Sequence, residues 1–212
     1  MSKTEADAPR RARGPDPSPA SALDCLAGGG DMGAMTRAID WSLSPVGPVS
    51  GWSQPFRTMV GLVLRNRFPL SLWWGPKLIQ FYNDPFRPIL GSKHPAAIGQ
   101  SGSECWAEIW NIIGPMIEGP FAGTPATGSE DLSLLIHRSG FFEETHFRVA
   151  YSPVPDETVA GTGIGGVLAT VSETTAQVQA DRQLRTLREL STRAAEAKSA
   201  TEACQKAAAV PP

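Results

Sequence analysis

Short apolar runs separated by glycine and proline restrict what this chain can fold into. Among its 212 residues are 21 glycines and 19 prolines. The apolar runs at 70–74 and 167–171 end well short of the roughly 18 to 20 residues that cross a bilayer. Runs of this length are typical of strands. We therefore expect one sheet-containing domain with extensions, and no insertion into a membrane.

Five runs have the length and composition of strands. Gly75 and Pro76 separate the first two runs, which predicts a tight turn and a hairpin. Within the fourth run, apolar side chains alternate with Glu144, His146 and Arg148, so one face is expected to pack while the other meets solvent. The five predicted strands cover residues 70–74, 78–82, 131–137, 143–152 and 163–172.

Three stretches have helical periodicity. Ser53 is a suitable cap, and the apolar residues of 56–64 follow the spacing of an amphipathic helix. Helical spacing returns between 83 and 121, where Pro115 is expected to separate two short helices. From 175 to 209 there is no glycine or proline, and opposite charges recur four residues apart, which predicts one long helix.

The long C-terminal helix carries a narrow apolar seam. Leu184 and Leu187 form its centre, and Ala180, Ser191 and Ala194 continue the spacing of four and three residues. The seam covers only about two heptads. This length predicts weak dimerisation through the helix.

The N-terminal part offers less regular patterns. Residues 1–27 have almost no large apolar side chains, a composition typical of a disordered leader. Glycine and proline interrupt the following stretch up to Gly51, which predicts an irregular wrap on the core. The predicted organisation is a leader at 1–27, the wrap and first helix at 28–67, a central domain at 68–176 and a linker helix at 177–212.

Charge and cysteine content argue against several classes of protein. With 19 basic and 21 acidic residues, the chain has no broad positive surface for nucleic acid. The arginines near the N-terminus lead into prolines instead of an apolar segment, so we expect no secretory signal and a cytoplasmic location. Cys25, Cys105 and Cys204 are far apart and odd in number, which fits neither a disulfide framework nor a zinc site and predicts reduced thiols.

Short motifs stand at the borders of the predicted strands, and a stretch with two tryptophans precedes them. In chain order they are the stretch at 40–52, FYND at 81–84, PILG at 88–91, YSP at 151–153, GGV at 165–167, and the exit motif Glu173, Thr174 and Thr175. Together with the order of elements, these motifs resemble the PAS domain of bacterial hybrid sensor histidine kinases over residues 28–176. Residues 187–204 resemble the linker and first helix of a GAF domain, the rest of which is missing.

The resemblance implies an α+β fold with a five-stranded antiparallel sheet, helices over one face and a C-terminal signalling helix. It implies a sensory input module of two-component signalling, in which Glu173, Thr174 and Thr175 couple the domain to the following helix. PAS domains that hold a ligand do so between helices and sheet. Tyr82, Trp106 and Trp110 are therefore candidate cavity residues, with a filled aromatic core as the simpler alternative.

The same resemblance suggests a second copy, downstream kinase or GAF domains, or a related kinase as partners. No histidine stands in the context of a phosphoacceptor helix and no ATP-lid motif is present, so we expect no kinase activity from this chain. The chain is expected to be a fragment, a frameshifted product or a remnant of a longer kinase. A stand-alone dimerisation or protein-interaction module is the alternative.

No catalytic residue and no metal ligand is predicted. Gly161, Gly163 and Gly166 match the spacing of a dinucleotide fingerprint, but the apolar run that follows is typical of a strand, so we interpret them as a hairpin loop. A thiol enzyme using Cys105 is the least favoured hypothesis, because no histidine or carboxylate partner is evident in the sequence. Acidic pairs such as Glu143 and Glu144 are expected to be solvated.

Flavin and haem are not expected as cofactors, whereas the binding of another small molecule is left as an alternative. Cys105 lies between glutamate and tryptophan instead of in the Asn-Cys-Arg context of light-sensing flavin sites of this fold. His94, His137 and His146 are predicted to be exposed, which argues against haem ligation.

Overall fold

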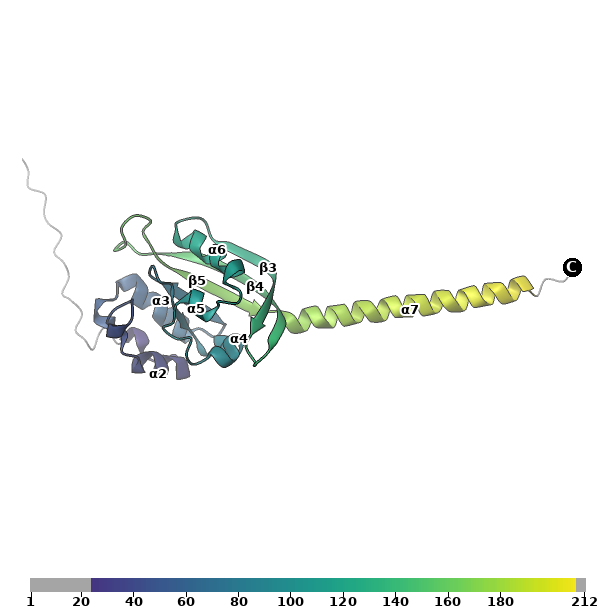
Figure 1. The fold of residues 1–212 in the computed structure, drawn as a ribbon, viewed down its shortest axis with the longest axis horizontal. Helices are drawn as coiled ribbons and strands as arrows, with labels where there is room; N and C mark the ends of the chain where they lie inside the picture. The colour runs from purple at the N-terminus through teal and green to yellow at the C-terminus, as the bar shows by residue number, and fades with distance from the viewer. Residues whose placement is uncertain (1–23, 209–212) are drawn as a thin grey trace, which may run out of the picture.

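The computed structural model describes residues 24–208 and contains an antiparallel sheet from which a long helix leads away (Figure 1). The strand order is β2-β1-β5-β4-β3, so the first and last strands are neighbours. The α+β class and the five strands expected from the PAS resemblance are confirmed. The strands are β1 (Leu70–Trp74), β2 (Ile79–Tyr82), β3 (Thr127–His137), β4 (Phe142–Pro155) and β5 (Ile164–Glu173).

The glycine motif lies in the β4–β5 hairpin and the start of β5. Gly161 and Gly163 have φ values of 85° and 67° in the loop, where glycine avoids a steric penalty. Gly166 lies in β5, where a Cβ would stand 2.4 Å from a ring carbon of Trp74 and 2.5 Å from the carbonyl oxygen of Trp73. Close strand packing therefore accounts for Gly166, and the interpretation as a hairpin loop is confirmed.

One face of the sheet is covered by the helical stretch between β2 and β3. Trp106, Ile109 and Ile113 are buried on this side against Phe147 and Tyr151 of β4. The covering elements are η4 (Asp84–Phe86), α4 (Arg87–Leu90), η5 (Gly91–Lys93), α5 (Gly102–Cys105) and α6 (Trp110–Phe121).

The predicted break at Pro115 is wrong, because α6 continues through Pro115 and Pro120. A proline removes the donor that would bond the carbonyl four residues earlier, here that of Asn111. Both Pro115 and Asn111 are exposed, so water can satisfy this carbonyl without ending the helix.

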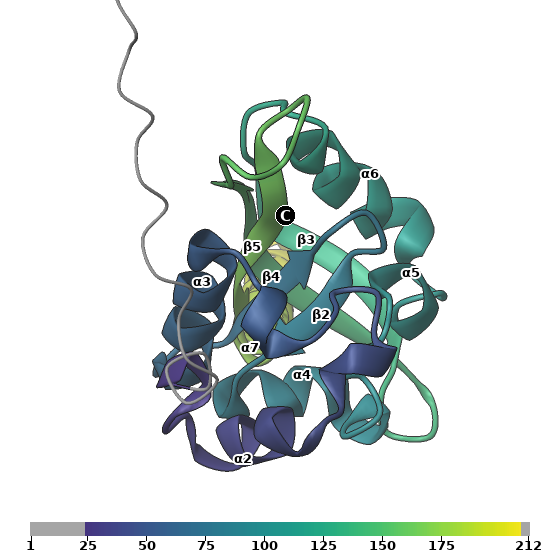
Figure 2. The ribbon, with the colours of Figure 1, turned by 90° about the vertical axis from the view of Figure 1, so that its left-hand side faces the viewer.

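Aromatic rings cover the opposite face of β1 and β2. The rings of Phe56 and Trp74 stack with centroids 4.4 Å apart, and those of Trp41 and Phe81 stack at 4.8 Å. Phe56 belongs to α3 (Gln54–Arg65), which confirms the predicted amphipathic helix. The Ser53 hydroxyl caps it by accepting a 3.2 Å hydrogen bond from the Phe56 amide. Figure 2 shows α3 and α6 on opposite sides of the strands.

The structure corrects two predictions for the N-terminal part. Leu26, placed in the leader, is fully buried in η1 (Asp24–Leu26), and the carbonyl of Asp24 accepts a 3.0 Å hydrogen bond from Arg65. The wrap is not wholly irregular, because it contains α2 (Gly30–Ala38). Residues 1–23 of the predicted leader lie outside the described residues.

Helix α2 is capped by a residue far away in the sequence. The Asp84 carboxylate accepts hydrogen bonds from the amides of Asp31 and Met32, both 3.0 Å long. A carboxylate at a helix N-terminus also interacts favourably with the helix dipole. Because this cap comes from more than 50 residues downstream, no local capping pattern marks the start of α2.

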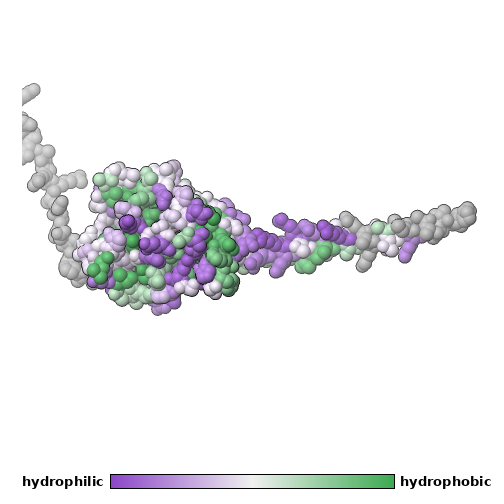
Figure 3. Space-filling model, viewed as in Figure 1, coloured by the Kyte–Doolittle hydropathy of each residue, from purple (hydrophilic) through white to green (hydrophobic). Residues whose placement is uncertain are grey.

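The predicted C-terminal helix is confirmed as α7 (Thr175–Ala208), which leaves the domain at the end of β5 (Figure 1). Its surface is largely hydrophilic with one apolar stretch (Figure 3). Within residues 24–208, no helix is both long and apolar enough to cross a membrane. The side chain of Cys204 lies outside the described residues.

Candidate functional site

A small apolar cavity lies between the sheet and its helical cover. Its volume is about 30 Å³, close to what a single water molecule needs. Trp106 lines it, whereas Tyr82 and Trp110 do not. The cavity is lined by Trp73, Phe86, Ile89, Trp106, Ile109, Ile113, Leu134, Ile136, Phe147, Val149, Tyr151 and Val171.

The three candidate cavity residues occupy different environments. Tyr82 is fully buried, its hydroxyl is 2.9 Å from Nδ1 of His94, and burial raises the pKa of the phenol. The ring of Phe86 lies between those of Tyr82 and Trp106, at 6.0 and 6.4 Å. Trp110 is half-buried and lines a surface hollow instead. The structure thus places Trp106 alone of the three at the cavity.

Gln80 is a buried polar residue beside the cavity that the sequence patterns did not single out. Its side-chain oxygen accepts hydrogen bonds from the indole nitrogens of Trp73 and Trp106, at 3.1 and 2.8 Å. Both indoles line the cavity, so Gln80 sets their orientation. A polar residue within the apolar run of β2 is the only local signal of this role.

Cys105 is buried near Gln80 and Tyr82. Burial raises the pKa of its thiol to about 12, so the thiol stays protonated at neutral pH. Because the thiolate is the reactive form, a thiol in this state is a poor nucleophile.

The exit motif forms an ionic junction with the β3–β4 hairpin. Arg138 donates two hydrogen bonds to the Glu173 carboxylate, 2.7 and 2.8 Å long, and a third of 3.1 Å to Glu143. These hydrogen bonds from Arg138 lower the pKa of Glu173. Two parallel bonds between guanidinium and carboxylate fix the geometry as well as the charge pairing.

The same arginine contacts the helical cover. The carbonyl of Arg138 accepts a 2.7 Å hydrogen bond from the Ser92 amide. Gly91, with φ of 54°, lies so close that a Cβ would stand 2.2 Å from this carbonyl oxygen. Ile89 of α4, two residues earlier, lines the cavity. Arg138 therefore stands between the cavity wall and the exit motif.

The first residues of α7 are bonded to β4. The Thr174 amide donates to the carbonyl of His146 at 2.8 Å, and the His146 amide donates to the Thr175 hydroxyl at 3.0 Å. The Thr175 hydroxyl in turn donates to Glu173 at 2.9 Å. These bonds fix where α7 begins relative to the sheet.

His146 is only 5% exposed, so its prediction as an exposed residue is wrong. Its Nδ1 lies 2.8 Å from Asp131 of β3, and its Nε2 lies 3.2 Å from Glu144 and 3.3 Å from Arg182 of α7. Arg182 also donates to Glu144 at 2.9 Å. Because Asp131 and Arg182 are 15 and 36 residues from His146, alternation along β4 does not reveal this burial.

The apolar seam and the sheet contacts lie on different sides of α7. Because successive helical residues turn by about 100°, Thr175 stands within roughly 20° of Arg182, whereas Leu184 and Leu187 stand roughly 160° and 140° from Arg182. Leu184 and Leu187 are 51% and 60% exposed. The seam is thus open to a partner while Arg182 contacts β4. We call the contacts of Arg138, Glu173, Thr175, His146 and Arg182 the exit junction.

Comparisons with known proteins add only a weak structural similarity to this geometry. No family model matches the sequence, and no curated protein matches it significantly. The chain is similar to the structure of an RNA-binding light-oxygen-voltage receptor, with a TM-score of 0.39 and 17% identity. The match covers 61% of this chain and 35% of that one, so this chain spans about a third of the receptor's length. Similarity at this level carries no argument about ligand or activity.

Proposed function

We propose that this chain is a sensory input module that passes the state of its core, or of a bound partner, to α7. The observation that carries the proposal is the exit junction, which binds the start of α7 to the sheet and leaves the Leu184 and Leu187 seam open. In this proposal the module is cytoplasmic and homodimeric, and it regulates the kinase or GAF domains of a two-component sensor or a related kinase.

A relay of this kind needs two arrangements of α7 that the signal favours unequally. The exit junction supports such arrangements because hydrogen bonds and ion pairs hold it, and each is worth only about 0.5–3 kcal/mol. A shift of the junction turns or tilts the whole helix, since α7 is continuous from Thr175 to Ala208. The seam then meets its partner in a different orientation.

The contacts of Arg138 connect the cavity to the exit junction. Ile89 lines the cavity, the following residues lie against the Arg138 backbone, and the Arg138 side chain holds Glu173. A ligand larger than about 30 Å³ would displace the cavity wall and hence this contact. A ligand the size of flavin or haem would require the core to open widely, so we include neither in the proposal.

Self-association of the purified chain tests the output side of this proposal. We expect the Leu184→Asp, Leu187→Asp double variant to lose dimer in sedimentation experiments, because a charge on the seam opposes helix packing. Thr192→Asp is the control, since it adds a charge to α7 about 120° around the helix from the centre of the seam and more than two turns beyond Arg182. Equal dimerisation of the double variant and the wild type would rule out the seam as the output.

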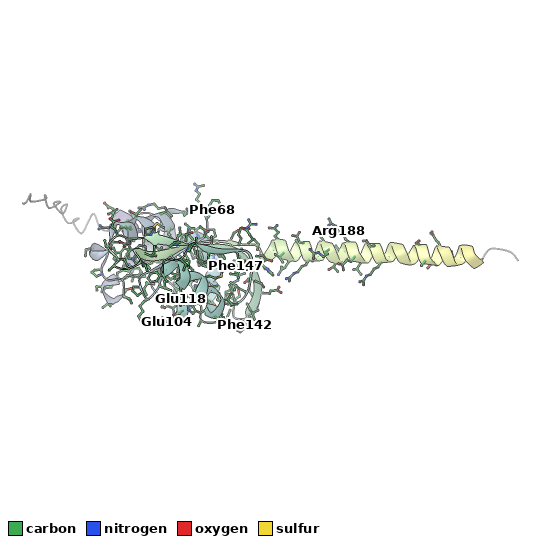
Figure 4. The ribbon with its side chains drawn as sticks, turned by 90° about the horizontal axis from the view of Figure 1, so that it is seen from above. Phe68, Glu104, Glu118, Phe142, Phe147 and Arg188 are labelled. Carbon is green, nitrogen blue, oxygen red and sulfur yellow. The ribbon has the colours of Figure 1, made fainter. Side chains whose placement is uncertain are left out.

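A stand-alone interaction module is the second candidate, and exposed apolar residues favour it. Leu135, Phe141 and Phe142 of the β3–β4 hairpin are 55%, 61% and 56% exposed. Phe142 lies at the end of the domain from which α7 leaves, whereas Arg188 marks the free part of α7 (Figure 4). Dimerisation that survives the seam variant but fails in Phe141→Ser, Phe142→Ser would favour this candidate.

A further inference from the structure

The contact between β4 and α7 is built around a buried, ionisable imidazole. His146 lies under the second turn of α7, with Asp131 at Nδ1 and both Glu144 and Arg182 at Nε2. An imidazole nitrogen can accept a hydrogen bond from Arg182 only without a proton, and can donate to Glu144 only with one. The two partners of Nε2 therefore belong to two protonation states.

In the neutral state, Nδ1–H donates to Asp131 and the Nε2 lone pair accepts a hydrogen bond from Arg182. Arg182 then holds both His146 and Glu144, at 3.3 and 2.9 Å. In the protonated state, Nε2–H donates to Glu144, and Arg182 faces a second cation at close range. Arg182 loses Nε2 as an acceptor, shares the Glu144 carboxylate with the imidazole, and is repelled by the imidazolium.

We propose that His146 is a proton-operated switch on the attachment of α7. Loss of the proton lets Arg182 bind Nε2 and fastens the first two turns of α7 to β4. After uptake of the proton, Nε2–H donates to Glu144 instead of accepting from Arg182, which weakens the attachment of these turns. The proposal goes beyond the sensory function above, since the switch acts on α7 whether or not the cavity binds a ligand.

The charges around His146 set the range in which this switch operates. Asp131 from β3 and Glu144 from β4 favour the imidazolium, whereas Arg182 from α7 opposes it. Further along the sheet, Glu130 and Arg148 neutralise one another in a 2.6 Å ion pair. The hydrogen bond to Asp131 contributes most, and the pKa of His146 is raised from its ordinary value of 6.5. Proton uptake thus occurs at a higher pH than for an ordinary histidine.

Thermodynamic reciprocity provides a direct test. If protonation weakens the Arg182 contact, then removing Arg182 must favour protonation by the same free energy. Titration of His146 by NMR is expected to show a higher pKa in Arg182→Gln than in the wild type. Arg185→Gln, three residues along α7, is the matched control and is expected to leave the titration unchanged. An unchanged pKa in Arg182→Gln would overturn the proposal.

Amide exchange measures the attachment itself. We expect the protection of the amides of residues 178–182, corrected for intrinsic exchange rates, to fall about threefold when the pH drops below the His146 titration. His146→Gln, which keeps a hydrogen-bonding side chain and carries no titrating proton, is expected to abolish this dependence. The same pH dependence in His146→Gln as in the wild type would contradict the switch. If the Leu184→Asp, Leu187→Asp variant dimerises like the wild type while the His146 titration and the amide exchange give the expected results, the seam is ruled out as the output and the switch is retained.

Discussion

The two ends of the sheet are stabilised by different kinds of contact. At the β1–β2 end, aromatic rings and apolar helices cover both faces, and Phe81 and Leu72 are fully buried. At the end where α7 leaves, charged and hydroxyl side chains make the contacts, and apolar side chains such as Phe142 are exposed. Packed aromatic cores resist rearrangement, whereas polar contacts near the surface exchange partners at small cost. The difference separates a rigid scaffold from a junction that can move.

Truncation of an aromatic side chain at the β1–β2 end is expected to have the largest effect on stability. Phe81→Ala leaves a cavity among Trp41, Trp52 and Phe56, and is expected to lower the free energy of unfolding by about 3–5 kcal/mol. Urea denaturation followed by circular dichroism measures this loss. Phe142→Ala, at the other end, is the control with an expected change of about 0.5 kcal/mol or less. Similar losses in the two variants would remove the distinction between the ends.

Removal of the Glu173 charge is expected to have an intermediate effect. Glu173→Gln breaks the paired hydrogen bonds with Arg138 and is expected to cost about 1–2 kcal/mol in the same assay. Glu157→Gln, in the exposed β4–β5 loop, is the control with little expected change.

The pH dependence of the stability loss in Glu173→Gln follows from the lowered pKa of Glu173. A carboxylate whose pKa is lower in the folded state stabilises the fold above its unfolded-state pKa, and this contribution disappears as the pH falls through the folded value. The stability difference between wild type and Glu173→Gln is therefore expected to shrink below the ordinary pKa of 4.5. A difference that stays constant down to strongly acidic pH would show that the charge on Glu173 does not stabilise the fold.

The sequence predicted the elements whose signals are local. The hairpin at Gly75 and Pro76, the Ser53 cap of α3 and the uninterrupted α7 were all predicted within a few residues. Helix α2 was missed because its cap, Asp84, lies beyond the intervening β-hairpin. The break predicted at Pro115 was wrong because the effect of this proline on α6 depends on whether the Asn111 carbonyl meets solvent, which the sequence does not show.

The candidate site was predicted only in part. The exit motif Glu173, Thr174 and Thr175 was named from resemblance, but its partner Arg138 lies 35 residues from Glu173 and was not identified. His146 was placed on a polar face, and the burial caused by α7 depends on how a distant segment returns to β4. Contacts of this kind follow from the tertiary arrangement, so spacing along the chain does not reveal them.

In the proposed function, the state of the core reaches α7 through Arg138. Val149→Ile adds one methylene to a residue that lines the 30 Å³ cavity, and Val159→Ile in the exposed loop is its control. Hydrogen exchange of residues 176–182 is the most direct measurement. We expect Val149→Ile to change their protection by at least about twofold, and Arg138→Gln to abolish this change. Protection that does not respond to Val149→Ile, or that responds equally in the Arg138→Gln background, would show that Arg138 does not couple the core to α7.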